Sequence, residues 1–169
     1  IVKVFECVAA ATGLTEKQLK RLSMPYQKIY IHPAHHATYY PNATSMTIKL
    51  LFETTGGRIL GAQIVGNEGV DKRIDVIAMA IQAGFTVFDL EEAELAYAPQ
   101  FGSAKDPVNM AGFVAAGVVR NDHQVIHVDD LANHPEAVLI DVRSEQEHQV
   151  GHIPGATLMP VDTLRDNLN

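Results

Sequence analysis

The hydrophobic pattern changes its period once in the first 120 residues, and this change constrains the fold most strongly. Apolar residues alternate with polar ones in segments 27–32, 45–53 and 58–65, most regularly in the first, as in β-strands whose two faces differ. Over residues 70–83 they recur every three or four positions, as on one face of an α-helix. The pattern predicts an α+β fold, an antiparallel sheet with helices on one face.

Turn and capping residues predict where further elements begin and end. The Thr-Thr-Gly-Gly stretch at 54–57 predicts a hairpin turn between the second and third strands. Thr15 is suited to cap a helix over residues 15–22. Two more helices are expected, at 89–95 and 107–118, and the small residues of the second predict close packing against a neighbour.

The chain changes character at Arg120, where a polar stretch predicts a linker. The apolar run at 137–142 is typical of a strand buried on both faces, as in parallel sheets. We therefore expect a first domain over residues 1–119, a linker over 120–126, and an incomplete α/β segment over 127–169.

Composition limits the class of protein. The net charge is -7 and no dense group of Lys and Arg is present, which argues against nucleic acid and anionic membranes as partners. No apolar run approaches the roughly 20 residues that span a bilayer. With one cysteine and no secretory signal, a cytoplasmic location is expected. The start at Ile1 rather than Met predicts that an upstream part is missing.

Two sequence features resemble a family of flavoenzymes. Residues 35–66, ending in G-G-x-I-L-G-A-x-x-V-G, resemble the dimerisation domain of the FAD- and NAD(P)H-dependent disulfide oxidoreductases. The pair Tyr39-Tyr40, with A-Y-A-P-Q-F at 96–101 and S-A-K-D-P at 103–107, resembles the coenzyme A-disulfide reductase branch and its NADH-dependent persulfide reductase relatives. The resemblance extends over about residues 1–118.

A second resemblance lies beyond the linker. Asp141-Val142-Arg143, Glu147, the G-H-I-P-G-A stretch at 151–156 and Pro160 resemble the N-terminal signature of rhodanese. In rhodanese-like folds, Asp141, Arg143 and Glu147 would organise the end of the strand. The sulfur-carrying cysteine of that family belongs to a later loop, so this segment is not expected to transfer sulfur.

The resemblance implies roles for tyrosines in a homodimer. Tyr39 and Tyr97 would reach across the subunit interface and assist thiolate departure at the partner's active-site cysteine, with Tyr40 as the alternative to Tyr39. Pro99 and Phe101 would approach the partner's FAD. On composition alone, the tyrosines would only supply amphipathic interface area.

The implied function is an FAD-dependent, NAD(P)H-consuming reductase of coenzyme A disulfide, persulfide or polysulfide. Gly56-Gly57 and Gly61 lie in a predicted hairpin and not at a strand-to-helix turn, so this chain alone is expected to bind neither FAD nor NAD(P)H and to be inactive. Two alternatives stay open: a non-catalytic dimerisation module carrying a rhodanese domain, and an NADH oxidase or peroxidase of the same superfamily.

Histidines and the cysteine are weaker candidates. His32, His35 and His36 lie within five residues, but no carboxylate or cysteine nearby in sequence completes a metal site, so no metal is expected. Cys7 is in no C-x-x-C pattern, and a buried, inert thiol is expected. The redox cysteine of the resembled enzymes belongs to their FAD-binding part.

Overall fold

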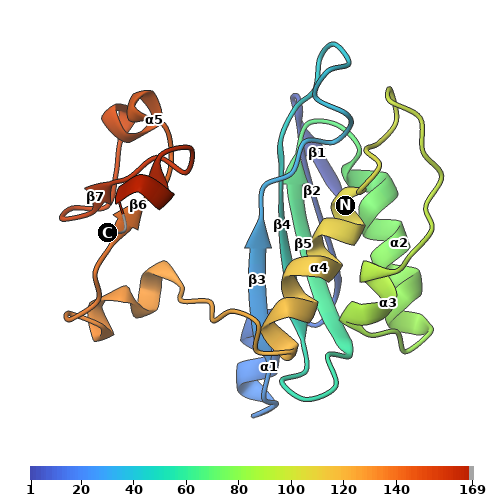
Figure 1. Cartoon of the computed structure of the whole chain (residues 1–169). Helices are drawn as coiled ribbons and strands as arrows, with labels where there is room; N and C mark the ends of the chain where they lie inside the picture. Colours follow the sequence, from blue (N-terminus) through green and yellow to red (C-terminus); the bar gives the residue numbers. More distant parts are fainter. Residues whose placement is uncertain (168–169) are drawn as a thin grey trace. The chain divides into compact units, whose positions relative to one another are not determined.

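The computed structural model describes residues 1–167 of the chain. Contacts divide the chain into two compact units, Ile1–Val125 and Ile126–Asn169 (Figure 1). Residues 168 and 169, the last two of the incomplete segment predicted over 127–169, lie outside the described part.

The first unit is built on a five-stranded antiparallel sheet with strand order β1-β2-β5-β4-β3. Its strands are β1 (Val2–Val4), β2 (Cys7–Gly13), β3 (Gln27–Ile31), β4 (Met46–Phe52) and β5 (Ile59–Gly66). The three strands predicted from alternation are confirmed to within a residue or two at each end. Their antiparallel pairing confirms the predicted hairpin between β4 and β5.

The hairpin of β1 and β2 was not predicted. Val4 pairs with Cys7, so Phe5 and Glu6 form the turn, and Phe5 adopts a left-handed conformation with φ 53°. Cys7 is exposed at this end of the sheet, so the expectation of a buried thiol is wrong. The physical reason is its place beside the turn of an edge hairpin, where no helix covers it.

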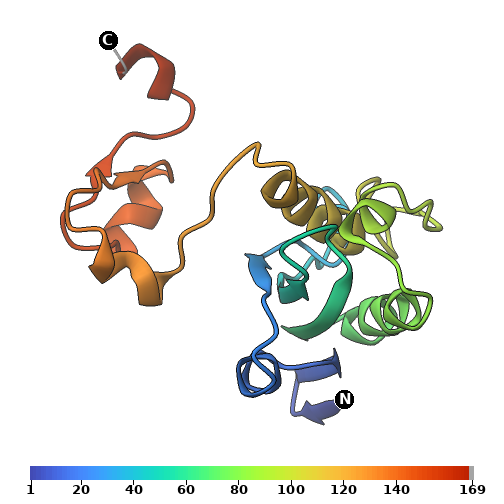
Figure 2. The ribbon, with the colours of Figure 1, turned by 90° about the horizontal axis from the view of Figure 1, so that it is seen from below.

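Two long helices cover one face of the sheet, as predicted (Figures 1 and 2). Helix α2 (Val70–Gln82) packs on β2 and β5, and helix α4 (Pro107–Val119) packs on β3 and β4. Inward-facing side chains of the strands and both helices form one apolar core. No helix in residues 1–167 is both long and apolar enough to cross a bilayer.

Helix α3 (Val87–Glu91) begins two residues before the predicted start and ends four residues earlier than predicted. Thr86 and Asp89 form a capping box that fixes its first turn. The predicted close packing of the small-residue helix is confirmed, because a Cβ on Gly112 would lie 2.3 Å from the backbone nitrogen of Glu91.

A short helix, α1 (Glu16–Arg21), packs on part of the opposite face of the sheet. Leu19 forms a second, smaller apolar cluster with Leu51 and Leu60. The predicted cap is confirmed, since Thr15 and Gln18 form a capping box. The sequence indicated this helix but not the face on which it lies.

The second unit has little regular structure in its described part. It contains η1 (Val128–Asn133), β6 (Ile140–Asp141), α5 (Glu145–Val150), β7 (Thr157–Leu158) and η2 (Leu164–Asn167). Strands β6 and β7 pair in parallel. The prediction of a strand buried on both faces over 137–142 is wrong, because the strand has two residues and Val138 is 83% exposed. In the described residues β6 has one neighbouring strand, too little to bury both of its faces.

Candidate functional site

Two long loops meet at one end of the sheet in the first unit (Figure 1). The first, residues 32–45, joins β3 to β4, and the second, residues 92–106, joins α3 to α4. The backbone N–H of Ala37 donates to the carbonyl of Gly102 over 2.9 Å, which ties the loops together. We call them the tyrosine loops, because Tyr39 lies on the first and Tyr97 on the second.

The first tyrosine loop is closed at its base by His35 and Thr44. The N–H of His35 donates to the carbonyl of Thr44 over 2.9 Å, and the N–H of Thr44 donates to Nδ1 of His35 over 3.0 Å. His36 is buried, and Nδ1 lies 3.0 Å from the carbonyl oxygen of Ala37. Within residues 1–167, no three metal-ligating side chains gather closely enough to hold an ion. The hydrogen bonds of His35 with Thr44 and of His36 with Ala37 hold the backbone of the first tyrosine loop.

Tyr39 and Tyr97 meet through their hydroxyl groups. The two oxygens lie 2.8 Å apart, although the residues are 58 positions apart in sequence. Both side chains are accessible, with Tyr39 75% and Tyr97 48% exposed. The hydrogen bond to Tyr39 raises the pKa of Tyr97 above its usual value, so Tyr97 keeps its proton at neutral pH. Such a pair can donate a hydrogen bond to an approaching anion.

Tyr40, the alternative to Tyr39, is directed elsewhere. Its ring packs edge-on against the ring of His36, with centroids 5.6 Å apart. Its backbone N–H donates to the carbonyl of Ala37 and forms a turn at the tip of the loop. Of the two adjacent tyrosines, Tyr39 is the one in contact with Tyr97.

Pro99 and Phe101 follow Tyr97 on the second tyrosine loop. Phe101 is 68% exposed, and its N–H donates to the carbonyl of Ala98 in a tight turn. Pro99 is half-buried. An exposed ring at this position fits an apolar contact with a planar group. The sheet of the first unit is antiparallel, whereas dinucleotide-binding folds are built on a parallel sheet.

Two charged residues beneath the loops were not singled out from the sequence. Arg73 on α2 donates to Asp106 in a bidentate pair, with Nε to Oδ1 at 3.1 Å and Nη2 to Oδ2 at 2.7 Å. Asp106 also caps α4, accepting from the N–H of Val108. The Asp-Pro pair before an apolar segment is a cap signature that could have identified Asp106. For Arg73 the signal was its spacing, three residues after Val70 and four before Ile77, which places it on the apolar face of the predicted helix.

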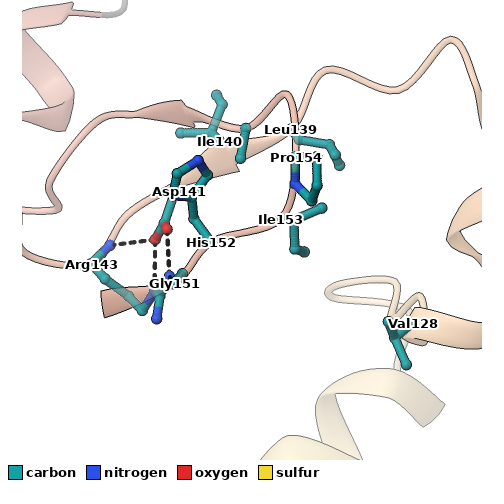
Figure 3. A pocket seen from close by; sticks show the side chains of 10 residues that line it. Val128, Leu139, Ile140, Asp141, Arg143, Gly151, His152, Ile153 and Pro154 are labelled. Atoms are coloured by element: carbon teal, nitrogen blue, oxygen red, sulfur yellow. Dashed lines mark hydrogen bonds and ion pairs between the residues drawn. The ribbon is translucent and has the colours of Figure 1, made fainter. Parts of the chain in front are cut away.

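In the second unit, Asp141 organises the end of β6 (Figure 3). Arg143 donates to both oxygens of Asp141, over 2.9 and 2.7 Å, and to the carbonyl of Gly151 over 2.8 Å. Nδ1 of His148 lies 3.0 Å from Asp141. These hydrogen bonds, from Arg143 first and His148 second, lower the pKa of Asp141 well below its usual range. Glu147 instead caps α5 through Ser144.

Two protein-family profiles match the chain, one in each unit. Residues 1–107 match the profile of the pyridine nucleotide-disulphide oxidoreductase dimerisation domain. The chain belongs to the pyridine nucleotide-disulphide oxidoreductase family. Residues 126–169 match the rhodanese-like domain. Both matches agree with the resemblances seen in the sequence.

Individual relatives place the chain within this family. A coenzyme A disulfide reductase of Staphylococcus aureus (strain bovine RF122 / ET3-1) is 40% identical over 115 residues, which cover 68% of this chain and 26% of the relative. The reduced CoADR-RHD of Bacillus anthracis is 48% identical with a TM-score of 0.94, and a NAD-dependent persulfide reductase of A. fulgidus is 37% identical with a TM-score of 0.89. Each comparison covers 98% of this chain and 30% of the solved chain. The chain thus spans about a quarter of the length of the curated relatives it matches.

Proposed function

We propose that the chain is the dimerisation part of an FAD-dependent, NAD(P)H-consuming reductase of coenzyme A disulfide, persulfide or polysulfide. The observation that carries the proposal is the exposed hydroxyl pair of Tyr39 and Tyr97, 2.8 Å apart on a dimerisation domain. The names of the similar proteins support the sulfur chemistry. The working form is a homodimer in the reducing cytoplasm, in which each chain presents its tyrosines to the partner's site.

The tyrosine pair would act on the leaving sulfur. Cleavage of a disulfide or persulfide breaks the S–S bond and leaves a thiolate or hydrosulfide anion, which a nearby proton donor stabilises. When one hydroxyl donates to the other, the accepting hydroxyl has its own proton free to point outward. Its donor strength also rises, because hydrogen bonds in a chain polarise one another. One of the two tyrosines therefore always presents a proton.

The redox cysteine and most of the FAD site would belong to a part of the enzyme outside this chain, where the bound flavin would supply electron transfer from NAD(P)H. Pro99 and Phe101 would supply an apolar contact to the partner's flavin. For the chain itself we propose a dimerisation domain over residues 1–119, a linker over 120–126 and the beginning of a rhodanese domain from residue 127.

The test uses the protein encoded by the complete gene that contains this sequence. We expect Tyr97→Phe and Tyr39→Phe each to lower kcat with coenzyme A disulfide at least about tenfold, because each breaks the hydroxyl pair and removes the hydrogen bond that orients and polarises the proton donated to the anion. The matched control is Tyr40→Phe, which removes the same atom one residue away and should change kcat less than about twofold, because Tyr40 contacts His36 and not Tyr97.

Two results would contradict the proposal. One is a protein without NAD(P)H-dependent reductase activity, as expected of a non-catalytic dimerisation module. The other is an enzyme that consumes NADH with dioxygen at the same rate in all three variants, as expected of an oxidase, whose acceptor releases no thiolate.

A further inference from the structure

The buried polar side chains of the described residues lie together beneath the tyrosine loops. They belong to α2, to the first turn of α4 and to the first loop itself. These residues are His36, Arg73, Asp106 and Asn109. The remaining buried side chains are apolar, and most of them lie in the core between the sheet and its two long helices or in the smaller cluster around Leu19. Among the described residues, the polar side chains that are fully buried are therefore concentrated at one place.

The guanidinium of Arg73 contacts both tyrosine loops. Arg73 is 1% exposed, and besides its pair with Asp106 its Nη2 donates to the carbonyl of His35 over 2.8 Å and to that of Phe101 over 3.3 Å. Tyr39 lies four residues after His35, and Tyr97 lies four residues before Phe101. One side chain thus fixes a backbone point close to each tyrosine.

The second tyrosine loop is held at both of its ends. Nδ2 of Asn109 donates to the carbonyls of Leu90 and Ala93, over 3.1 and 2.8 Å, where the loop begins. Asp106 holds the other end through its pair with Arg73. The path of the chain around Tyr97 is therefore set by side chains from the first turn of α4 and from α2.

The backbone leaves room for the guanidinium. Gly69 precedes α2 with φ 69°, and a Cβ on this residue would lie 2.3 Å from Nη1 of Arg73. The carbonyl of Gly69 accepts from the same nitrogen over 3.3 Å. Independently of the hydrogen bonds to the loops, this close approach shows that the guanidinium of Arg73 occupies space that a side chain at position 69 would fill.

Stability alone does not account for such an arrangement. Taking an arginine and an aspartate out of water has a desolvation cost that cancels most of their attraction, and apolar side chains of similar volume often stabilise a core as well or better. Apolar side chains cannot donate to two loop carbonyls. What the buried pair provides is a defined geometry for both loops.

We infer that Arg73, held by Asp106, is a positioning residue that keeps the hydroxyls of Tyr39 and Tyr97 within hydrogen-bond distance for their work on the leaving thiolate. This inference rests on the proposed function and names the device that sets its geometry. Arg73 acts through the loops and touches neither hydroxyl.

The experiment compares two substrates that differ in their need for a proton donor. Coenzyme A disulfide releases an aliphatic thiolate of high pKa, whereas dithiobis(nitrobenzoic acid) releases an aryl thiolate of low pKa that departs without assistance. In the protein from the complete gene, Arg73→Lys keeps the charge but loses the planar fork, and Asp106→Asn keeps the shape but loses the charge. Arg58→Lys is the matched control, because Arg58 also pairs with a carboxylate, Glu53, in the β4–β5 hairpin, at the other end of β4 from the loops.

For Arg73→Lys and Asp106→Asn we expect turnover of coenzyme A disulfide to fall at least about tenfold and turnover of the aryl disulfide to change less than about twofold. Arg58→Lys should leave the ratio of the two rates unchanged. Hydrogen exchange gives a readout independent of activity. The amide of Ala37, bonded to Gly102, should exchange faster in both loop variants, and the amide of Leu14, bonded to Leu60 at a distant turn, should not.

Equal loss with both substrates, or no loss with either, would overturn the inference. So would failure of both variants to fold, because the pair would then serve stability. Tyr97→Phe, tested on the same two substrates, distinguishes failure of the proposed function from failure of the positioning inference. If it leaves their ratio unchanged, the proposed function fails. If it changes the ratio and Arg73→Lys does not, only the positioning inference fails.

Discussion

At Gly69, both the backbone conformation and the neighbouring side chain of Arg73 disfavour any residue that carries a Cβ. Its left-handed backbone, with φ 69°, has an intrinsic cost for any residue that carries a Cβ. A Cβ here would also meet the guanidinium of Arg73. That group lies at the end of a long side chain, but its bonds to Asp106 and His35 prevent it from moving freely.

We therefore expect Gly69→Ala to lower the free energy of unfolding by more than about 2 kcal/mol, combining backbone strain with overpacking. Gly84→Ala is the control, because Gly84 has a similar φ of 73° with no atom within 4 Å of a built Cβ. It should cost only about 1 kcal/mol. Urea unfolding of both variants measures the difference. Equal decreases in the free energy of unfolding would show that the Arg73 side chain moves aside at no energetic cost.

Single residues differ in how far the sequence reveals them. Tyr39 and Tyr97 were predicted because their motifs resemble a known family, but no local pattern could indicate that their hydroxyls meet. Arg73 falls on the apolar face that Val70 and Ile77 define in the predicted helix, but arginine is rarely buried, so its residue type indicated a solvated side chain. Cys7 was expected to be buried because cysteine usually is, and the turn beside it could not be foreseen.

At the scale of elements, α1 is joined to the sheet by a charged cluster centred on Glu16. Its carboxylate accepts from the hydroxyl of Tyr26 over 2.8 Å, from Lys28 over 3.0 Å and from Lys49. Burial raises the pKa of Glu16, but the hydrogen bonds from Lys49, Lys28 and Tyr26 outweigh it and leave the pKa well below its usual range. Burial and the bond to Glu16 raise the pKa of Tyr26 to about 12.

This cluster predicts a dependence of stability on pH. Because the folded-state pKa of Glu16 lies below its unfolded value of about 4.5, its stabilisation is complete above that pH and is lost as pH falls toward the folded value. At pH 7, Glu16→Gln should lower the free energy of unfolding by about 1–3 kcal/mol, since it leaves mostly buried lysines without a carboxylate. The difference from the native protein should shrink below about pH 4.5.

The matched control is Glu53→Gln, which breaks an exposed pair with Arg58 within the β4–β5 hairpin. Exposed ion pairs contribute little, so its effect should stay below about 1 kcal/mol at pH 7. Denaturant unfolding from pH 3 to pH 8 measures both variants. A Glu16→Gln difference that does not change with pH would contradict the assigned cause.

Elements were predictable where one face of them is buried. Strands β3, β4 and β5 and helix α2 each place a periodic apolar face on the core, so their pattern is strong, whereas α4 is apolar almost throughout and was indicated by its small residues. The β1–β2 hairpin forms a sheet edge with exposed valines and a run of alanines, which carry almost no alternation. For α3, the Thr86 and Asp89 cap was available in the sequence and was missed.

At the scale of the whole molecule, the two units differ in what holds each of them together. The first has a continuous apolar core between its sheet and helices. In the second, no side chain of residues 126–166 is buried, and Val128, Val138 and Val150 are largely exposed. A unit that buries so little apolar surface gains little free energy from folding.

The two units should therefore respond differently to a protease. We expect brief digestion of this chain with subtilisin to cut first within residues 120–126, the predicted linker, and then to degrade the second unit. A fragment near residues 1–120 should persist, because its backbone is bonded in the sheet and helices and opens rarely. Mass spectrometry identifies the cut sites, and urea unfolding should give the same midpoint for that fragment as for the chain.

The protein encoded by the complete gene supplies the comparison. If a full rhodanese domain follows residue 127 there, its added strands and helices would bury the apolar residues of β6, and the second unit should resist digestion as the first does. The linker would then be the main remaining site of cleavage. An initial cut inside the sheet of the first unit, or resistance of the second unit in the 169-residue chain, would show that stability is not divided between the units as their burial indicates.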